Sequence, residues 1–135
     1  MKKAFNLIEL IFVILIIGLL VGIGVYSFKP NHQRNDTRML AMQLQKARYQ
    51  GINYYQKRFD SGIGCLKPAA LSIKNYTFKS RIDPKGFQTI CFDYLGRVYL
   101  DGQRAKDQVQ IELSYRSKTA TIQIDPKTGY VIINN

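Results

Sequence analysis

The first candidate for chemistry in this sequence is an acid inside a long apolar run. The run extends from Phe5 to Phe28, and Glu9 is its only full charge. At the centre of a bilayer such a carboxylate costs roughly 2.5–3.5 kcal/mol on insertion scales. If the run is helical, Phe5 and Glu9 share one face because they lie four residues apart. A positive group near Phe5 would compensate Glu9, since a buried charge without a partner is costly.

Other residue types that commonly perform catalysis or bind metals are few and scattered. His32 is the only histidine, and we expect it to be a solvated linker residue, because no second histidine or acid cluster accompanies it. No nucleophile motif stands beside it, so a Ser/His/Asp hydrolase is hard to build. The G-x-x-x-x-G-K-[ST] loop of nucleotide-binding proteins does not occur. We therefore expect a protein that is not an enzyme and needs no cofactor and no metal.

The only two cysteines are Cys65 and Cys91, and neither belongs to a C-x-x-C pair, which excludes a four-cysteine zinc site. If both lie in an oxidising compartment, a disulfide between them is the natural prediction. Closing that loop would contribute roughly 3 kcal/mol in the chain-entropy model. The alternative is two independent buried thiols.

The charge balance of the chain is strongly basic. Its 135 residues include 20 Lys+Arg against 9 Asp+Glu, for a formal charge of +11. The length indicates one domain, and the excess charge favours anionic partners such as lipid headgroups, nucleic acid or acidic proteins. The basic residues are spread along the chain and do not form a tail, so a merely soluble basic surface is the alternative.

The apolar run predicts a helix over residues 5–28 that is about 36 Å long, enough to cross a hydrocarbon core of about 30 Å. Lys2 and Lys3 precede it, which places the N-terminus on the cytoplasmic side. Gly18 and Gly22 form a G-x-x-x-G spacing that permits close helix approach. The alternative for this pair is ordinary small residues in an apolar helix.

Beyond this run the pattern predicts an α+β domain. Pro30 predicts a kink, followed by an amphipathic helix over residues 36–59, capped by Asp36 or Thr37. Its apolar positions are Met39, Leu40, Leu44, Ala47 and either Tyr49 or Gly51. From about residue 71 to residue 133 the period changes to two, with turns at positions 83–86, 95–96, 101–102 and 125–129. We expect one antiparallel sheet, covered by the amphipathic helix.

The N-terminal segment Ala4-Phe5-Asn6-Leu7-Ile8-Glu9-Leu10 resembles the prepilin-type cleavage and methylation motif. The resemblance implies that a membrane peptidase cuts between Ala4 and Phe5 and that Phe5 is then N-methylated. Ala4 departs from the usual glycine but is still small. The chain would comprise a leader (1–4), a transmembrane and filament-core helix (5–28) and a periplasmic pilin-like domain (29–135). In the filament, the amine of Phe5 would meet Glu9 of a neighbouring subunit.

Looser motifs are similar to those of H-type minor pseudopilins and FimT-like minor pilins, within the type IV pilin and type II secretion pseudopilin superfamily. They are Leu44-Gln45-Lys46-Ala47-Arg48, the stretch from Ile90 to Val98, and the stretch from Ile124 to Val131. The resemblance implies a structural subunit of a filament that moves macromolecules across the envelope. Its partners would be other pilin or pseudopilin subunits, the prepilin peptidase and an inner-membrane assembly platform. The location would be the bacterial inner membrane, single-pass, with the C-terminal domain periplasmic.

Two alternatives stay open at this point. The first is a DNA-binding minor pilin of a natural-transformation pilus, in which basic residues near predicted turns track phosphates if the turns share one edge. These residues are Arg97, Arg104, Lys106, Arg116, Lys118 and Lys127, with Tyr99, Tyr115 and Tyr130 as candidates for base stacking. The second is a secreted protein with a conventional signal peptide, cut between Gly22 and Ser27.

Overall fold

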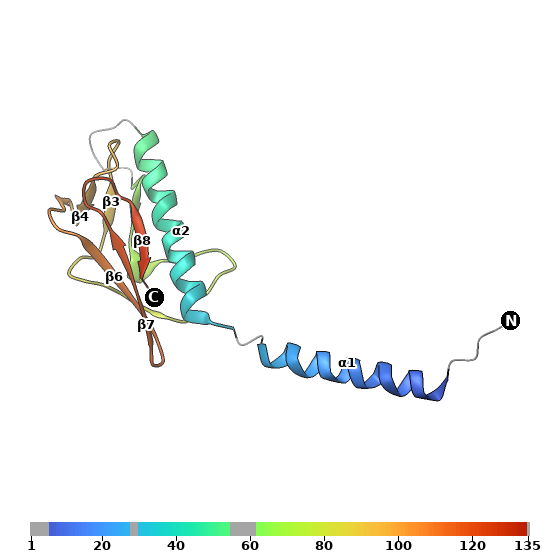
Figure 1. The fold of residues 1–135 in the computed structure, drawn as a ribbon. Coiled ribbons are helices and arrows are strands. Elements are labelled where there is room, and N and C mark those ends of the chain that lie inside the picture. The colour runs from blue at the N-terminus through green and yellow to red at the C-terminus, as the bar shows by residue number, and fades with distance from the viewer. Residues whose placement is uncertain (1–5, 28–29, 55–61, 135) are drawn as a thin grey trace. The chain divides into compact units, whose positions relative to one another are not determined.

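The computed structural model of the chain describes residues 6–27, 30–54 and 62–134. These residues fall into two compact units, Met1–Pro30 and Asn31–Asn135, and each unit is described by itself (Figure 1). The coarse class is the predicted one, α+β. Helices come first in the chain, and antiparallel strands follow them.

The first unit contains the helix α1, Leu7–Ser27. Leucine, isoleucine and valine with isolated glycines make up most of it, Glu9 is its only charged residue, and no proline occurs within it. The prediction of a helix in the apolar run is therefore confirmed for these residues. The leader, Phe5 and Phe28 lie outside the described residues.

The second unit begins with α2, His32–Asn53, which starts earlier than the predicted residue 36. Asn31 is the cap, and its side chain accepts a hydrogen bond from the Arg34 backbone N–H. The prediction that Asp36 or Thr37 caps the helix is therefore wrong. Both side chains are buried within the helix, at 2% and 0% exposure. Asn31 precedes both residues in the chain and is itself a favoured capping residue.

The predicted inward face of α2 is largely confirmed. Leu40, Leu44, Ala47 and Gly51 are buried. Of the two alternatives for the last position, Gly51 is correct, because Tyr49 is 70% exposed. The helix ends at Asn53, short of the predicted residue 59, and residues 55–61 lie outside the described part of the chain.

The strands form two four-stranded antiparallel sheets, and the prediction of a single sheet is wrong. One sheet has the order β1-β3-β4-β5, and the other has the order β2-β6-β7-β8. The first contains β1 (Cys65–Leu66), β3 (Ile90–Phe92), β4 (Val98–Leu100) and β5 (Gln103–Arg104). The second contains β2 (Arg81–Pro84), β6 (Val109–Tyr115), β7 (Lys118–Ile124) and β8 (Val131–Asn134). The long alternating strands β6 and β7 have the predicted bounds within two residues.

Two local predictions fail before β3. The period of two predicted from about residue 71 does not produce a strand between Leu71 and Phe78. That stretch follows the short 3-10 helix η1 (Pro68–Ala70) and makes only an isolated bridge between Ile73 and Tyr76. The predicted turn over residues 83–86 is shorter, because Asp83 and Pro84 belong to β2. Proline is tolerated there because β2 is an edge strand.

Helix α2 packs against strands of both sheets and supplies the centre of the core. Leu40, Leu44, Phe92, Ile111 and Ile122 are among the largest fully buried side chains. At Gly51 the helix approaches the β3 backbone so closely that a Cβ atom would collide with the carbonyl group of Phe92. The core therefore lies entirely within the second unit.

Candidate functional site

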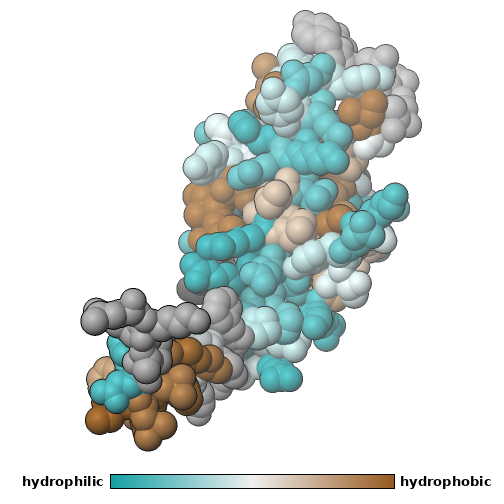
Figure 2. Space-filling view, turned by 90° about the vertical axis from the view of Figure 1, so that its right-hand side faces the viewer, coloured by the Kyte–Doolittle hydropathy of each residue, from teal (hydrophilic) through white to brown (hydrophobic). Residues whose placement is uncertain are grey.

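From Leu7 to Gly24 the surface of α1 is apolar apart from Glu9, and it is uncovered. None of the window Leu7–Gly24 is buried, and Ile8 is 73% exposed. Figure 2, which looks toward the N-terminal end of α1, shows hydrophobic side chains gathered there, whereas the visible face of the second unit is largely hydrophilic. At 1.5 Å per residue the helix is about 31 Å long, close to the thickness of a hydrocarbon core. By length and composition α1 is suited to be a single membrane span or a signal sequence.

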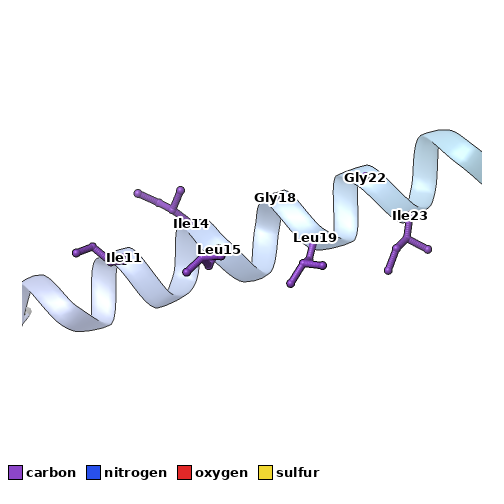
Figure 3. A pocket seen from close by; sticks show the side chains of 7 residues that line it. All are labelled: Ile11, Ile14, Leu15, Gly18, Leu19, Gly22 and Ile23. Atoms are coloured by element: carbon purple, nitrogen blue, oxygen red, sulfur yellow. The ribbon is translucent and has the colours of Figure 1, made fainter.

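Gly18 and Gly22, the predicted close-approach pair, lie along an open hollow on one face of α1. The hollow has a volume of about 650 Å³ and is lined by Ile11, Ile14, Leu15, Gly18, Leu19, Gly22 and Ile23 (Figure 3). Apart from the adjacent residues and the helix's own backbone, no described atom lies within 4 Å of the position that a Cβ would take at either glycine. The hollow therefore has room for an apolar side chain from another helix or a lipid.

Glu9 lies in the first turn of α1 and is exposed. Its backbone N–H donates to the Asn6 carbonyl oxygen at 2.8 Å, which begins the helix. A carboxylate at this position interacts favourably with the positive end of the helix dipole. The proposed processing residues Ala4 and Phe5 lie outside the described residues.

The two cysteines form the predicted disulfide. Cys65 in β1 and Cys91 in β3 are direct partners in the antiparallel register, and their Cα atoms are 4.0 Å apart. The bridge therefore attaches the two-residue strand β1 to its sheet. The alternative of two independent thiols is excluded.

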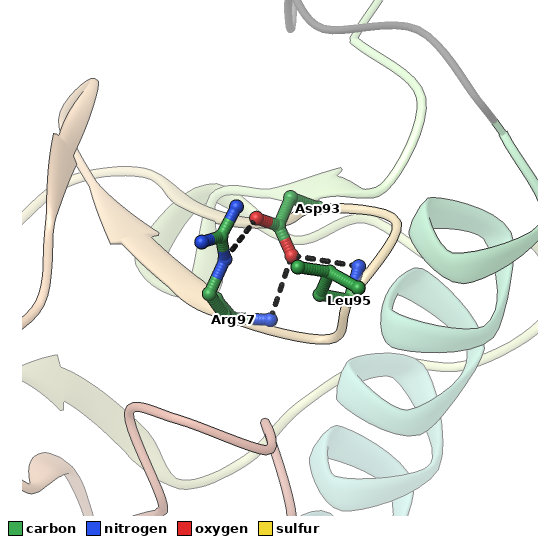
Figure 4. A network of polar contacts seen from close by, with 3 residues as sticks. All are labelled: Asp93, Leu95 and Arg97. Carbon is green, nitrogen blue, oxygen red and sulfur yellow. Dashed lines mark hydrogen bonds and ion pairs between the residues drawn. The ribbon is translucent and has the colours of Figure 1, made fainter.

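Among the predicted basic residues, Arg97 forms an ion pair within the chain. Its Nε donates to the Asp93 carboxylate at 2.6 Å, and its backbone N–H donates to the same carboxylate at 2.8 Å (Figure 4). Leu95 also donates its backbone N–H to Asp93, so the acid organises the β3–β4 turn. The hydrogen bond to Asp93 raises the pKa of Arg97. Arg97 thus has a structural partner and is the weakest of the predicted phosphate contacts.

The other predicted basic residues divide between two ends of the second unit. Arg116 and Lys118 flank the β6–β7 turn, where β7 begins. Lys127 lies in the turn after β7 ends, and the strand between them is roughly 20 Å long. Two backbone hydrogen bonds bring Arg104 and Lys106 near Lys127. The N–H of Ala105, which lies between them, donates to the Val98 carbonyl oxygen, and the Val98 N–H donates to the carbonyl oxygen of Pro126, the residue before Lys127. The condition that all these turns share one edge is therefore not met.

The candidate stacking tyrosines differ in exposure. Tyr130 is 61% exposed, while Tyr99 and Tyr115 are half-buried. The ring of Tyr115 meets the ring of His32 edge to face, with centroids 5.6 Å apart. The prediction that His32 is a solvated linker residue is wrong, because it is the first residue of α2 and packs on the sheet.

The buried acid Asp36 organises the loop before β2 and does not serve as the predicted helix cap. The Asp36 carboxylate accepts hydrogen bonds from the Tyr76 hydroxyl at 2.6 Å, the Lys79 backbone N–H at 3.0 Å and the Ser80 backbone N–H at 2.7 Å. Burial alone would raise the pKa of Asp36, but these hydrogen bonds outweigh it and lower the pKa. Burial and the bond to Asp36 raise the pKa of Tyr76 to about 12. The partners are more than 35 residues away in sequence, so no local signal identified this role.

Within the described ranges, no group of three or more His, Cys, Asp or Glu residues is placed to hold a metal ion. No family model, curated protein or solved structure matches the chain. The candidate site is therefore the surface of α1, with its acidic first turn and glycine hollow, joined to a separately folded basic unit.

Proposed function

We propose that this chain is a minor pilin or pseudopilin, a structural subunit of a type II secretion or type IV pilus-like filament. The observation that carries the proposal is the uncovered apolar helix α1 with one carboxylate in its first turn. The second unit has its own core and a disulfide, so it does not need α1 for packing. The surface of α1 is thus free to serve another purpose.

An uncovered apolar helix of this length needs an apolar environment. Covering exposed side chains such as Ile8, Leu19 and Ile23 stabilises by about 25 cal/mol for each Å² removed from water. A bilayer supplies this cover before assembly, and packed helices of neighbouring subunits supply it afterwards. One surface thereby acts as membrane anchor and as filament core.

Glu9 would fix the axial position of one subunit relative to its neighbour. In a filament its charge would need a partner, and the amine of a neighbour's Phe5, freed by cleavage after Ala4, supplies one. Removing one member of a buried ion pair costs about 3–5 kcal/mol, because the other charge is left uncompensated. Misregistered subunits would pay that penalty, so the pair selects one axial position.

The hollow at Gly18 and Gly22 supports the same role. Small residues at four-residue spacing let helix backbones approach closely, and packing then replaces the missing hydrophobic driving force inside a membrane. A branched side chain at Gly18 or Gly22 would fill the hollow and hold a neighbouring helix away.

In this proposal the protein is not an enzyme, and it resides in the bacterial inner membrane before it enters the filament. The N-terminus is cytoplasmic, and the second unit is periplasmic, where the disulfide is stable. Its partners are homologous subunits, the prepilin peptidase and the assembly platform.

The test is incorporation of the full chain into sheared filaments in cells that carry the assembly machinery. We expect wild-type protein in the filament fraction and Glu9→Ala in the membrane fraction. Glu112→Ala is the matched control, because Glu112 is a sheet residue paired with Lys85 and lies outside α1. Equal incorporation of wild type and Glu9→Ala, or absence of the wild type from filaments, would contradict the proposal.

A further inference from the structure

The end of the second unit at which α2 begins carries five exposed cations. They are Arg34, Lys79, Arg81, Arg116 and Lys118, here called the basal cluster. Figure 1 shows the start of α2 and the β6–β7 turn at the same, lower end of this unit. The sequence pattern does not single out this group, because its members come from three separate stretches of the chain.

Contacts within the unit hold these segments together. His32 at the start of α2 meets Tyr115 at the end of β6, and the Arg116 guanidinium lies 5.4 Å from the centroid of the Tyr115 ring. Lys118 is the direct partner of Tyr115 in the sheet.

The remaining members join through β2 and Asp36. Arg81 lies opposite Ser114, the residue before Tyr115. The backbone N–H of Lys79 donates to the Asp36 carboxylate, which holds Lys79 beside α2. Asp36 is only two residues after Arg34, so this bond also brings Lys79 near Arg34. The basal cluster is therefore one surface of the fold.

The acids of this unit do not neutralise the cluster. Asp36 is buried and already accepts three hydrogen bonds. In the described part of Asn31–Asn135, the ion pairs are Lys85 with Asp83 and Glu112, and Arg97 with Asp93. Asp101 and Asp125 accept backbone hydrogen bonds in their own turns. A second copy of the chain therefore offers few free acids, and an external anion is the complementary partner.

The chain length limits how far this end can be from α1. Ser27 ends α1 and His32 begins α2, and an extended connection of that length spans at most about 18 Å. If α1 spans a bilayer, the start of α2 must therefore lie near its surface. On the cytoplasmic side of a membrane helix, clusters of four to eight basic residues are typical of binding to anionic lipid. The same electrostatic attraction acts at any leaflet that carries anionic headgroups.

We propose that the basal cluster binds the anionic phospholipid headgroups of the membrane that α1 spans. The inference rests on the membrane insertion in the proposed function and adds a docked state of the subunit before assembly. A planar array of phosphates matches a group of cations gathered at one end. Duplex DNA is the less suitable partner, because the other predicted phosphate contacts, Arg104, Lys106 and Lys127, lie at the opposite end.

The test uses the full chain reconstituted in vesicles. The chain has no tryptophan, so Ser117→Trp places one fluorophore in the exposed β6–β7 turn. Energy transfer to a dansyl headgroup lipid then reports how close this turn is to the bilayer. The probes are phosphatidylcholine vesicles with and without phosphatidylglycerol. Any affinity of the new tryptophan for the membrane interface is the same in both kinds of vesicle. The difference in energy transfer between them therefore reports the effect of lipid charge.

We expect greater transfer in the phosphatidylglycerol vesicles, reversed in about 1 M salt, where the Debye length is about 3 Å. The triple variant Arg81→Gln, Arg116→Gln, Lys118→Gln should lower the ratio of docked to undocked protein by about two orders of magnitude, since each basic residue contributes roughly fivefold. The matched control Arg104→Gln, Lys106→Gln, Lys127→Gln removes the same charge from the opposite end and should dock as the parent does.

Equal transfer in both kinds of vesicle, or equal docking by the two triple variants, overturns the inference. So does a basal triple variant that docks as the parent does but loses binding to a duplex oligonucleotide, which would assign the cluster to nucleic acid. Flotation with phosphatidylcholine vesicles separates this test from that of the proposed function. Failure to float means that α1 does not insert, whereas a chain that floats without charge-dependent docking refutes only the basal cluster.

Discussion

Replacing Asp36 with alanine is expected to destabilise the second unit by about 3–6 kcal/mol. The carboxylate accepts hydrogen bonds from Tyr76, Lys79 and Ser80, and the residue is 2% exposed. Hydrogen bonds to a charged group contribute about 1.5–3 kcal/mol each, and they are not fully additive. Against a typical total stability of about 5–15 kcal/mol, this loss is large.

The assay is urea unfolding of the fragment from Asn31 onward, which contains the whole core and the disulfide. Tyr76→Phe removes one of the three hydrogen bonds and should cost about 1.5–3 kcal/mol. In the Asp36→Ala background the same substitution should cost little, because its acceptor is already gone. Asn35→Ala, at the exposed neighbouring position, should change stability by less than about 0.5 kcal/mol.

The contribution of Asp36 also depends on pH. Since the folded protein lowers the pKa of this carboxyl below its usual 3.8, its stabilisation is complete above that pH and is lost as the pH falls through the folded pKa. Wild type should therefore lose stability more steeply in acid than Asp36→Asn does. A cost for Asp36→Ala below about 1 kcal/mol, or additive effects of the Asp36 and Tyr76 substitutions, would refute this account of the loop.

Three further predictions concern the same fragment. Replacing Cys65 and Cys91 with serine should cost roughly 3 kcal/mol in urea unfolding, because an open loop gains entropy in the unfolded chain; an unchanged midpoint would contradict this. Gly51→Ala should cost about 1–3 kcal/mol by the same assay, the usual range for overpacking, since the added Cβ meets the Phe92 carbonyl. The exposed neighbour Gln50→Ala is its control, and equal stability of the two variants would argue against the close contact. In gel shifts, duplex DNA should bind weakly at low salt and dissociate as salt rises; tight binding that resists salt would favour the DNA-receptor alternative.

The regular parts of the fold could be predicted because their patterns are local. The apolar run forms α1, and the alternation of Val109, Ile111 and Leu113 gives β6. The spacing of Leu40, Leu44 and Ala47 gives the buried face of α2. Each pattern repeats at the period of its own element, so no knowledge of distant residues is needed.

The errors arise where distant residues decide the structure. Asp36 has the side chain of a capping residue, but its partners lie in the segment Tyr76–Ser80 and bury it. His32 was expected in a linker, and Tyr115 holds it on the sheet. The strand β1 has only two residues and so shows almost no pattern of its own. It pairs with β3 in a register that places Cys65 opposite Cys91, where the disulfide joins them. The division into two sheets follows from such long-range pairings.

The candidate site was predictable in part for the same reason. Glu9, Gly18 and Gly22 lie in one helix, so their spacing alone places them along it. The basal cluster was not, because Arg34, Lys79, Arg81 and Lys118 come together only in the fold.

The central claim is that α1 belongs to a filament subunit matured by cleavage after Ala4. Mass spectrometry of the N-terminal peptide, isolated from membranes of cells that carry the prepilin peptidase, tests it most directly. The claim predicts a peptide that begins at Phe5 and bears one added methyl group on its amine. A mature chain that begins between Gly22 and Ser27 would instead show a conventional signal peptide and contradict the claim.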